Sequence, residues 1–195
     1  MSATLEILGP IIVPPHKRWT RDECVVLEQT GLIDSDRYEL IEGELIQKMG
    51  KNHPHMLTVL LLGAWLRSIF GETFVVQEPS IDLWPEDSPT SEPEPDMVVL
   101  RRSFREFSTR AIPSDLRLVV EVSSSTLTFD LTTKARLYAR SRIVEYWVID
   151  VAGRRVIVHH DPDQGEYKTV TAYAEQESVA TSAVPEREIR VGDLF

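Results

Sequence analysis

Residues 118–122 read LVVEV, and this short run constrains the fold of the chain more than any other feature. Consecutive apolar residues without polar alternation predict a strand that is buried on both faces. Glu121 is out of place in such a strand, because burying a carboxylate without a partner either costs several kcal/mol or removes its charge. A cation, a hydrogen-bond network or a chemical role would account for it. Glu121 is therefore the first candidate functional residue.

A second acid, Asp96, stands at the start of the comparable apolar run 97–100. Farther along, Asp130, Lys134 and Tyr138 are spaced by four residues in a predicted helix, so they share one helix face. This helix starts close to the end of the Glu121 strand, and Lys134 can point back over the two acids. Two carboxylates suit Mg²⁺, which lowers the pKa of a bound water, and a lysine can position that water or stabilise a pentacovalent phosphate. These residues predict a metal-dependent phosphodiester hydrolase.

The order of the predicted elements indicates an α/β fold with a mixed sheet flanked by helices. Helices are predicted after the capping-box pattern of residues 20–23 and over residues 55–70 and 129–141. Strands are predicted over residues 38–46 (two short strands about a turn), 73–77, 80–84, 96–100, 116–122, 145–151, 154–160 and 166–173. The length of 195 residues fits a single domain, residues 1–195, in which residues 1–19 form an irregular arm and the C-terminal segment packs back on the body.

The formal net charge of −10 argues against a nucleic-acid partner, because such proteins usually carry a basic face. Four arginines nevertheless cluster within ten positions, where they could grip a phosphate backbone or simply solvate a loop: Arg101, Arg102, Arg105 and Arg110. The sequence shows no signal peptide and no apolar run long enough to cross a membrane. The single cysteine, Cys24, cannot form an internal disulfide, so a cytoplasmic location is expected.

The motifs form an ordered set that is more specific than any one member. The set comprises RYELIEGE (residues 37–44), His55, Pro95-Asp96, LVVEVS (118–123), the spaced Asp130, Lys134 and Tyr138, and EYWVID (145–150). It resembles the PD-(D/E)xK nuclease superfamily and, within it, the Uma-two family of restriction endonucleases, over residues 38–151. The resemblance implies a restriction-endonuclease-like core and a Mg²⁺- or Mn²⁺-dependent endonuclease that acts on DNA.

The resemblance also implies roles for individual residues. Asp96 and Glu121 are the expected metal ligands and catalytic acids, Glu44 is a further expected metal ligand, and His55 is expected to border the site. Nucleases of this type often cut both strands as homodimers, but no residue here identifies a dimer surface.

One departure concerns the catalytic lysine. The superfamily usually has a lysine two positions after the glutamate, and Ser123 occupies that position here. The family takes this lysine from the following helix, so Lys134 is the expected catalytic lysine. The chain reads Ser-Ser-Ser at residues 123–125 where the family commonly has Ser-Pro-Ser, which alters the rigidity of the loop more than its chemistry.

Several candidates also have purely structural interpretations. Glu121 could be neutralised by Arg136 or Arg140, and Asp130 and Lys134 could form an exposed helix pair. Tyr138 is more typical of packing than of catalysis. Glu44 is equally compatible with a solvated strand residue, and His55 with a helix start.

For the whole chain the alternative function is a non-catalytic binding or assembly module that keeps the nuclease fold. The acidic composition favours this alternative, and the acid–acid–lysine set opposes it. A weaker option is a metal-dependent hydrolase that acts on another phosphodiester.

Overall fold

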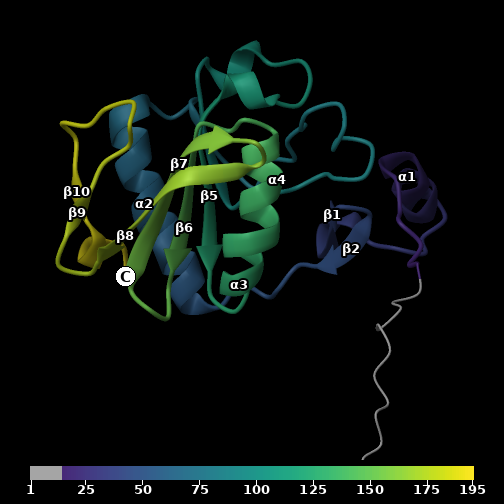
Figure 1. The fold of residues 1–195 in the computed structure, drawn as a ribbon, viewed down its shortest axis with the longest axis horizontal. Coiled ribbons are helices and arrows are strands. Elements are labelled where there is room, and N and C mark those ends of the chain that lie inside the picture. The colour runs from purple at the N-terminus through teal and green to yellow at the C-terminus, as the bar shows by residue number, and fades with distance from the viewer. Residues whose placement is uncertain (1–14) are drawn as a thin grey trace, which may run out of the picture.

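The computed structural model describes residues 15–195 and is built around a mixed six-stranded sheet (Figure 1). Its strands, in the order in which they lie side by side, are β3 (Val75–Gln77), β4 (Met97–Leu100), β5 (Leu116–Ser123), β6 (Glu145–Asp150), β7 (Arg155–Asp163) and β8 (Glu166–Ala174). Within this sheet β5 and β6 run parallel, and every other neighbouring pair runs antiparallel. The predicted mixed sheet is confirmed.

Helices cover both faces of the sheet (Figure 1). α2 (His53–Phe70) lies on one face. A continuous helical segment lies on the other and consists of α3 (Leu127–Phe129), the π-helical turn η4 (Asp130–Lys134) and α4 (Ala135–Arg140). This segment crosses from the end of β5 to the start of β6, which is the connection that two parallel neighbours need. The helix predicted over residues 129–141 is confirmed, whereas the wide turn within it was not predicted.

Two apolar cores result, one on each face of the sheet. Val119 of β5 belongs to the core formed with Leu137 of α4, and Val120 belongs to the core formed with Leu62 of α2. Because side chains alternate along a strand, Glu121 points to the same side as Val119, toward the crossing helix. The strand is buried on both faces, as its apolar sequence predicts.

Shorter elements complete the fold. They are the helix α1 (Arg21–Gln29), the hairpin of β1 (Tyr38–Ile41) and β2 (Glu44–Gln47), the paired strands β9 (Ser178–Val179) and β10 (Ile189–Arg190), and the 3₁₀ turns η1 (Ser35–Arg37), η2 (Phe104–Glu106), η3 (Pro113–Asp115) and η5 (Val191–Leu194). Val191 and Leu194 are fully buried in the core on the α2 side. The prediction that the C-terminal segment packs back on the body is confirmed.

The strand predicted over residues 80–84 is absent from the structure. Ile81 and Leu83 are buried and produce the alternating pattern. The backbone N–H groups of Ile81 and Asp82 instead bond to the carbonyls of Pro93 and Ala111, in two different loops. Without one partner strand, no ladder forms.

Two chain segments differ from their predicted limits. α2 begins at His53, because the side chain of Asn52 caps it by accepting a hydrogen bond from the His55 N–H at 3.0 Å. Residues 1–14 of the predicted arm lie outside the described residues, and residues 15–20 are in neither helix nor strand. Within the described part of the chain, no helix is long and apolar enough to span a bilayer.

Candidate active site

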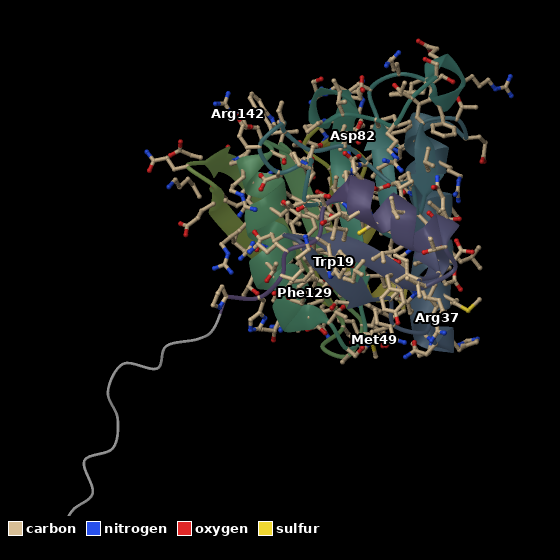
Figure 2. The ribbon with its side chains drawn as sticks, turned by 90° about the vertical axis from the view of Figure 1, so that its right-hand side faces the viewer. Trp19, Arg37, Met49, Asp82, Phe129 and Arg142 are labelled. Carbon is tan, nitrogen blue, oxygen red and sulfur yellow. The ribbon has the colours of Figure 1, made fainter. Side chains whose placement is uncertain are left out.

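A pocket of about 420 Å³ opens at the end of the sheet where β4 begins and β5 ends. The β1–β2 hairpin, the loop between β2 and α2, and the helical segment after β5 supply its walls. Met49 of the loop and Phe129 of α3 both line it and both lie toward the lower end of the molecule in Figure 2. Its charged lining consists of six acids and three lysines: Glu39, Glu78, Glu94, Asp96, Glu121, Asp130, Lys48, Lys51 and Lys134.

Asp96 and Glu121 lie opposite each other across two neighbouring strands. β4 and β5 pair Met97 with Val120 in antiparallel register, so the next pair outward is Asp96 with Glu121. Cβ atoms of directly opposite residues are about 4.5–5.5 Å apart. The N–H of Val122 holds Asp96 by donating to its Oδ2 at 2.7 Å. The fold thus brings together the two acids predicted as metal ligands.

Glu121 is only 5% exposed, and the helical segment holds one of its oxygens. Oε1 accepts hydrogen bonds from Nζ of Lys134 at 3.0 Å and from the hydroxyl of Tyr138 at 2.8 Å. Oε2 accepts none within residues 15–195, which leaves it available to the pocket that Glu121 lines. Burial raises the pKa of this carboxyl group well above its ordinary value, against the opposing effect of the Lys134 ammonium.

Lys134 is the ionic partner of Glu121. Its Nζ lies 2.9 Å from Oε1 of Glu39 and 3.0 Å from Oε1 of Glu121, and the residue is only 4% exposed. Burial by itself would lower the pKa of Lys134, but the two carboxylates outweigh burial and raise it. Lys134 therefore keeps its charge inside the protein.

The arginine partners considered for Glu121, and the exposed pair of Asp130 and Lys134, are not what the structure shows. Arg136 is exposed, and Arg140 forms ion pairs with Glu42 and Asp87, so neither arginine neutralises Glu121. Asp130 and Lys134 do not form an exposed helix pair, because both are buried.

Glu39, rather than Glu44, is the acid that the β1–β2 hairpin brings to the pocket. Glu39 pairs with Ile46 across the hairpin, and both residues line the pocket. Glu44 pairs with Ile41 next to the turn, is exposed and does not line the pocket. Glu44 lies two residues before Ile46 along β2, and two residues span about 6.6 Å along a strand. Glu44 is therefore about that far from the position beside Glu39. The prediction that placed Glu44 at the metal site is wrong.

The π-helical turn η4 sets the position of Asp130 relative to Lys134 and Tyr138. Within it the N–H of Ala135 bonds to the carbonyl of Asp130, five residues back instead of four. A four-residue step overshoots a regular α-turn by about 40°. A four-residue step within the wider π-turn rotates by less than a full turn. The rotation from Asp130 to Lys134, within the π-turn, and the rotation from Lys134 to Tyr138, within regular helix, therefore deviate from a full turn in opposite directions. Lys134 and Tyr138, one regular helical turn apart, both reach Oε1 of Glu121.

Asp130 ties the loop after β5 to the start of the helix. Its Oδ2 accepts hydrogen bonds from the hydroxyls of Ser123 at 2.8 Å and Thr126 at 2.6 Å. Burial raises the pKa of Asp130, and Lys134 opposes that shift. The loop after β5 is therefore held to the helix by the side-chain hydrogen bonds of Ser123 and Thr126.

His55 lies beside Asp96, as the resemblance led us to expect. Its Nε2 is 3.1 Å from Oδ1 of Asp96, and its Nδ1 is buried without a hydrogen-bond partner among residues 15–195. With Nε2 protonated, His55 donates to Asp96 and fixes the orientation of that carboxylate.

The arginine cluster lies at the other end of the sheet. Arg101 follows the last residue of β4, whereas Asp96 precedes the first, and none of the four arginines lines the pocket. Arg102 contacts Asp115 at 3.3 Å, and Arg110 pairs with Glu92. These interactions favour the interpretation of the cluster as part of loop structure.

The donor set fits a hard divalent cation. Within residues 15–195 no three His, Cys, Asp or Glu side chains converge as a closed metal cage. Asp96 and Glu121 instead offer oxygen ligands on one side of an open pocket. Mg²⁺ commonly binds through one or two carboxylates and keeps several waters, which matches this arrangement.

A family model described as "Putative restriction endonuclease", Uma2, matches residues 27–192. The chain belongs to this family. The resemblance seen in the motifs is thereby confirmed, and the match includes the hairpin, the sheet and the crossing helix.

A solved structure has the same fold. It is the crystal structure titled as that of "a putative nuclease belonging to DUF820" from Anabaena variabilis ATCC 29413, with a TM-score of 0.64 and 16% sequence identity. The match covers 86% of this chain and 95% of that chain. No curated protein matches the chain.

Proposed function

We propose that this Uma2 family member is a Mg²⁺- or Mn²⁺-dependent endonuclease that hydrolyses phosphodiester bonds of DNA. The observation that carries the proposal is the arrangement of Asp96, Glu121 and Lys134. Two acids lie opposite each other on neighbouring strands, and a buried ammonium group lies 3.0 Å from one of them. Membership of the Uma2 family supports the same class of reaction.

Each residue has a role in this proposal. Asp96 and Glu121 would hold the cation, with Oε2 of Glu121 as the free oxygen on the pocket side. Bound there, the cation would activate a water and neutralise charge on the phosphate. Lys134 would orient the attacking water or stabilise negative charge on the phosphate, while Glu39 and Tyr138 keep the Lys134–Glu121 pair in place.

The excess of acids in the pocket favours one alternative, a non-catalytic module. Without a cation the pocket repels a polyanion, because acids outnumber lysines along its walls. A nuclease overcomes this repulsion by binding a metal cation, whereas a non-catalytic module does not need a metal in this pocket. Metal binding at Asp96 and Glu121 therefore separates the two functions.

Calorimetric titration with Mn²⁺ is the first test. We expect the wild type to bind Mn²⁺, and Asp96→Asn to lose that binding while it stays folded. The control is Asp163→Asn, which removes an exposed acid outside the pocket. Absence of Mn²⁺ binding in the wild type, with and without DNA, would support the non-catalytic module.

Cleavage of supercoiled plasmid is the second test. Asp96→Asn and Glu121→Gln should each abolish nicking, and Lys134→Ala should lower turnover more than it lowers Mn²⁺ affinity. Unchanged cleavage by pure samples of both acid variants would overturn the assignment.

A further inference from the structure

The loop between β2 and α2, residues 48–52, carries the solvent-accessible positive charge of the pocket wall. Lys48 and Lys51 stand on it, on either side of the exposed Met49. Their side chains are 27% and 39% exposed, whereas Lys134 is buried between two acids. Among the described residues that line the pocket, Lys48 and Lys51 are therefore the cations that reach solvent.

Each of these lysines is held by an acid of the pocket wall. Nζ of Lys48 lies 2.7 Å from Oε2 of Glu94, and Lys51 pairs with Glu78. The partners are 26% and 54% exposed. The Lys51–Glu78 pair is the more open to solvent and contributes little to stability, so Lys51 can exchange its carboxylate for another anion at small cost. Lys48 is more buried and also donates to the carbonyl of Ser35 at 3.1 Å, so its exchange costs more.

A third cation extends the same edge. The N–H of Lys48 bonds to the carbonyl of Arg37 at 2.8 Å, which places Arg37 next to the loop. Figure 2 shows Arg37 and Met49 along the same side of the molecule. Arg37 is exposed and forms no ion pair within residues 15–195. Arg37 thus adds an exposed cation next to the loop that carries Lys48 and Lys51, in a protein whose net charge is −10.

We propose that this loop grips the backbone of duplex DNA, with Lys48 and Lys51 leaving Glu94 and Glu78 for phosphates that flank the one held in the pocket. The inference rests on the proposed nuclease function and assigns its substrate contacts. Glu78 and Glu94 then oppose binding, because each competes with a phosphate for its lysine. Neutralising Glu78 strengthens binding, and removing Lys51 weakens it.

Fluorescence anisotropy with a labelled mixed-sequence DNA duplex tests the loop, in Ca²⁺ and over a range of salt concentrations. We expect Lys48→Ala/Lys51→Ala to weaken binding at least about tenfold and to reduce the slope of log K against log salt by about 2. The matched control is Lys168→Ala, an exposed lysine that pairs with Asp163 away from the pocket. Likewise, Glu78→Gln should raise the affinity more than Asp163→Asn does.

The outcomes separate this inference from the proposed function. If the wild type binds Mn²⁺ and cuts plasmid, but the double variant keeps its affinity and salt slope, the role of the loop is overturned and the nuclease stands. If the wild type neither binds Mn²⁺ nor cuts, the proposed function fails. A wild type that does not bind the duplex overturns the loop assignment as well. Equal melting temperatures confirm that the variants are folded.

Discussion

The hydroxyl of Tyr138 lies 2.8 Å from Oε1 of Glu121, and the tyrosine side chain itself is completely buried. Lys134 contacts the same oxygen from the preceding turn of the helix. Tyr138 is therefore a packing residue of the core and also a donor to the candidate metal ligand. The interpretation of Tyr138 as packing alone is incomplete.

Removing this hydroxyl separates its two roles. Tyr138→Phe keeps the ring, and we expect the free energy of unfolding to fall by about 1.5–3 kcal/mol because a bond to a charged group is lost. Mn²⁺ affinity should also fall, since the ionised form of Glu121 loses a donor. Urea unfolding and calorimetry measure the two effects. The control is Tyr167→Phe. The hydroxyl of Tyr167 donates to the carbonyl of Ile143, away from Glu121, so its removal should leave Mn²⁺ affinity unchanged.

The buried ion pairs of Lys134 predict a large effect on stability. Lys134→Met should lower the free energy of unfolding by about 3–5 kcal/mol, because Glu39 and Glu121 then lack a buried cation. Adding Glu39→Gln to this variant should recover part of the loss. Chemical denaturation of both variants gives the comparison. A single variant within about 1 kcal/mol of the wild type would show that Lys134 is not the group that neutralises these acids.

His159 makes stability depend on pH. Its ring is buried, Nδ1 lies 3.3 Å from the carbonyl of Tyr146, and burial lowers the pKa of His159 below its ordinary value. The unfolded chain, with a histidine pKa of about 6.5, therefore takes up the proton first as the pH falls. This contribution to stability is complete above about pH 6.5 and is lost below it.

The corresponding measurement is urea unfolding at about pH 7.5 and about pH 5.5. The loss of stability on acidification should be smaller in His159→Gln than in the wild type. His160→Gln, which changes the less buried neighbour, is the control. An equal loss in both variants would assign the effect to other groups.

Glu145 fastens the C-terminal segment to the sheet by hydrogen bonds, with no cation paired to it among residues 15–195. It has no exposed surface, and it accepts hydrogen bonds from Nε1 of Trp147 at 2.8 Å and from the N–H and hydroxyl of Ser182 at 3.0 and 2.5 Å. Glu145→Gln replaces one carboxylate oxygen by an NH₂ group, which cannot accept the hydrogen bonds that Trp147 and Ser182 donate. We expect a loss of about 1–3 kcal/mol and faster proteolysis of residues 178–195. Exposed Glu166→Gln is the control, and equal proteolysis of the two variants would contradict the prediction.

Local sequence patterns were sufficient to predict some of the residues of the candidate site. The run LVVEV produced a doubly buried strand, and Asp96 entered the site because the register of β4 and β5 places it opposite Glu121. Glu39 could not be distinguished in the same way. The hairpin has glutamates at positions 39, 42 and 44, and which of them meets Lys134 depends on packing against a helix far along the chain. The one available signal was the position of Glu39 between apolar residues in YELI.

Other features leave no trace in apolar periodicity. The wide turn at residues 130–134 changes hydrogen bonding by one residue, and its sequence DLTTK gives no distinct pattern. Residues 80–84 alternate as a strand does, because Ile81 and Leu83 are buried, but whether a partner strand exists is decided elsewhere in the fold.

The wide turn also predicts where the chain tolerates the loss of one residue. It holds one residue more than a regular helix of the same span, and Thr132 within it is exposed and does not line the pocket. Loss of that single codon would let the helix become regular while α4 keeps its place in the core. The residues on both sides would keep their helix faces, because the wide turn only accommodates the extra residue. A shortened chain would thus keep Lys134 and Tyr138 beside Glu121, so the length of this helix can vary between relatives without moving the site.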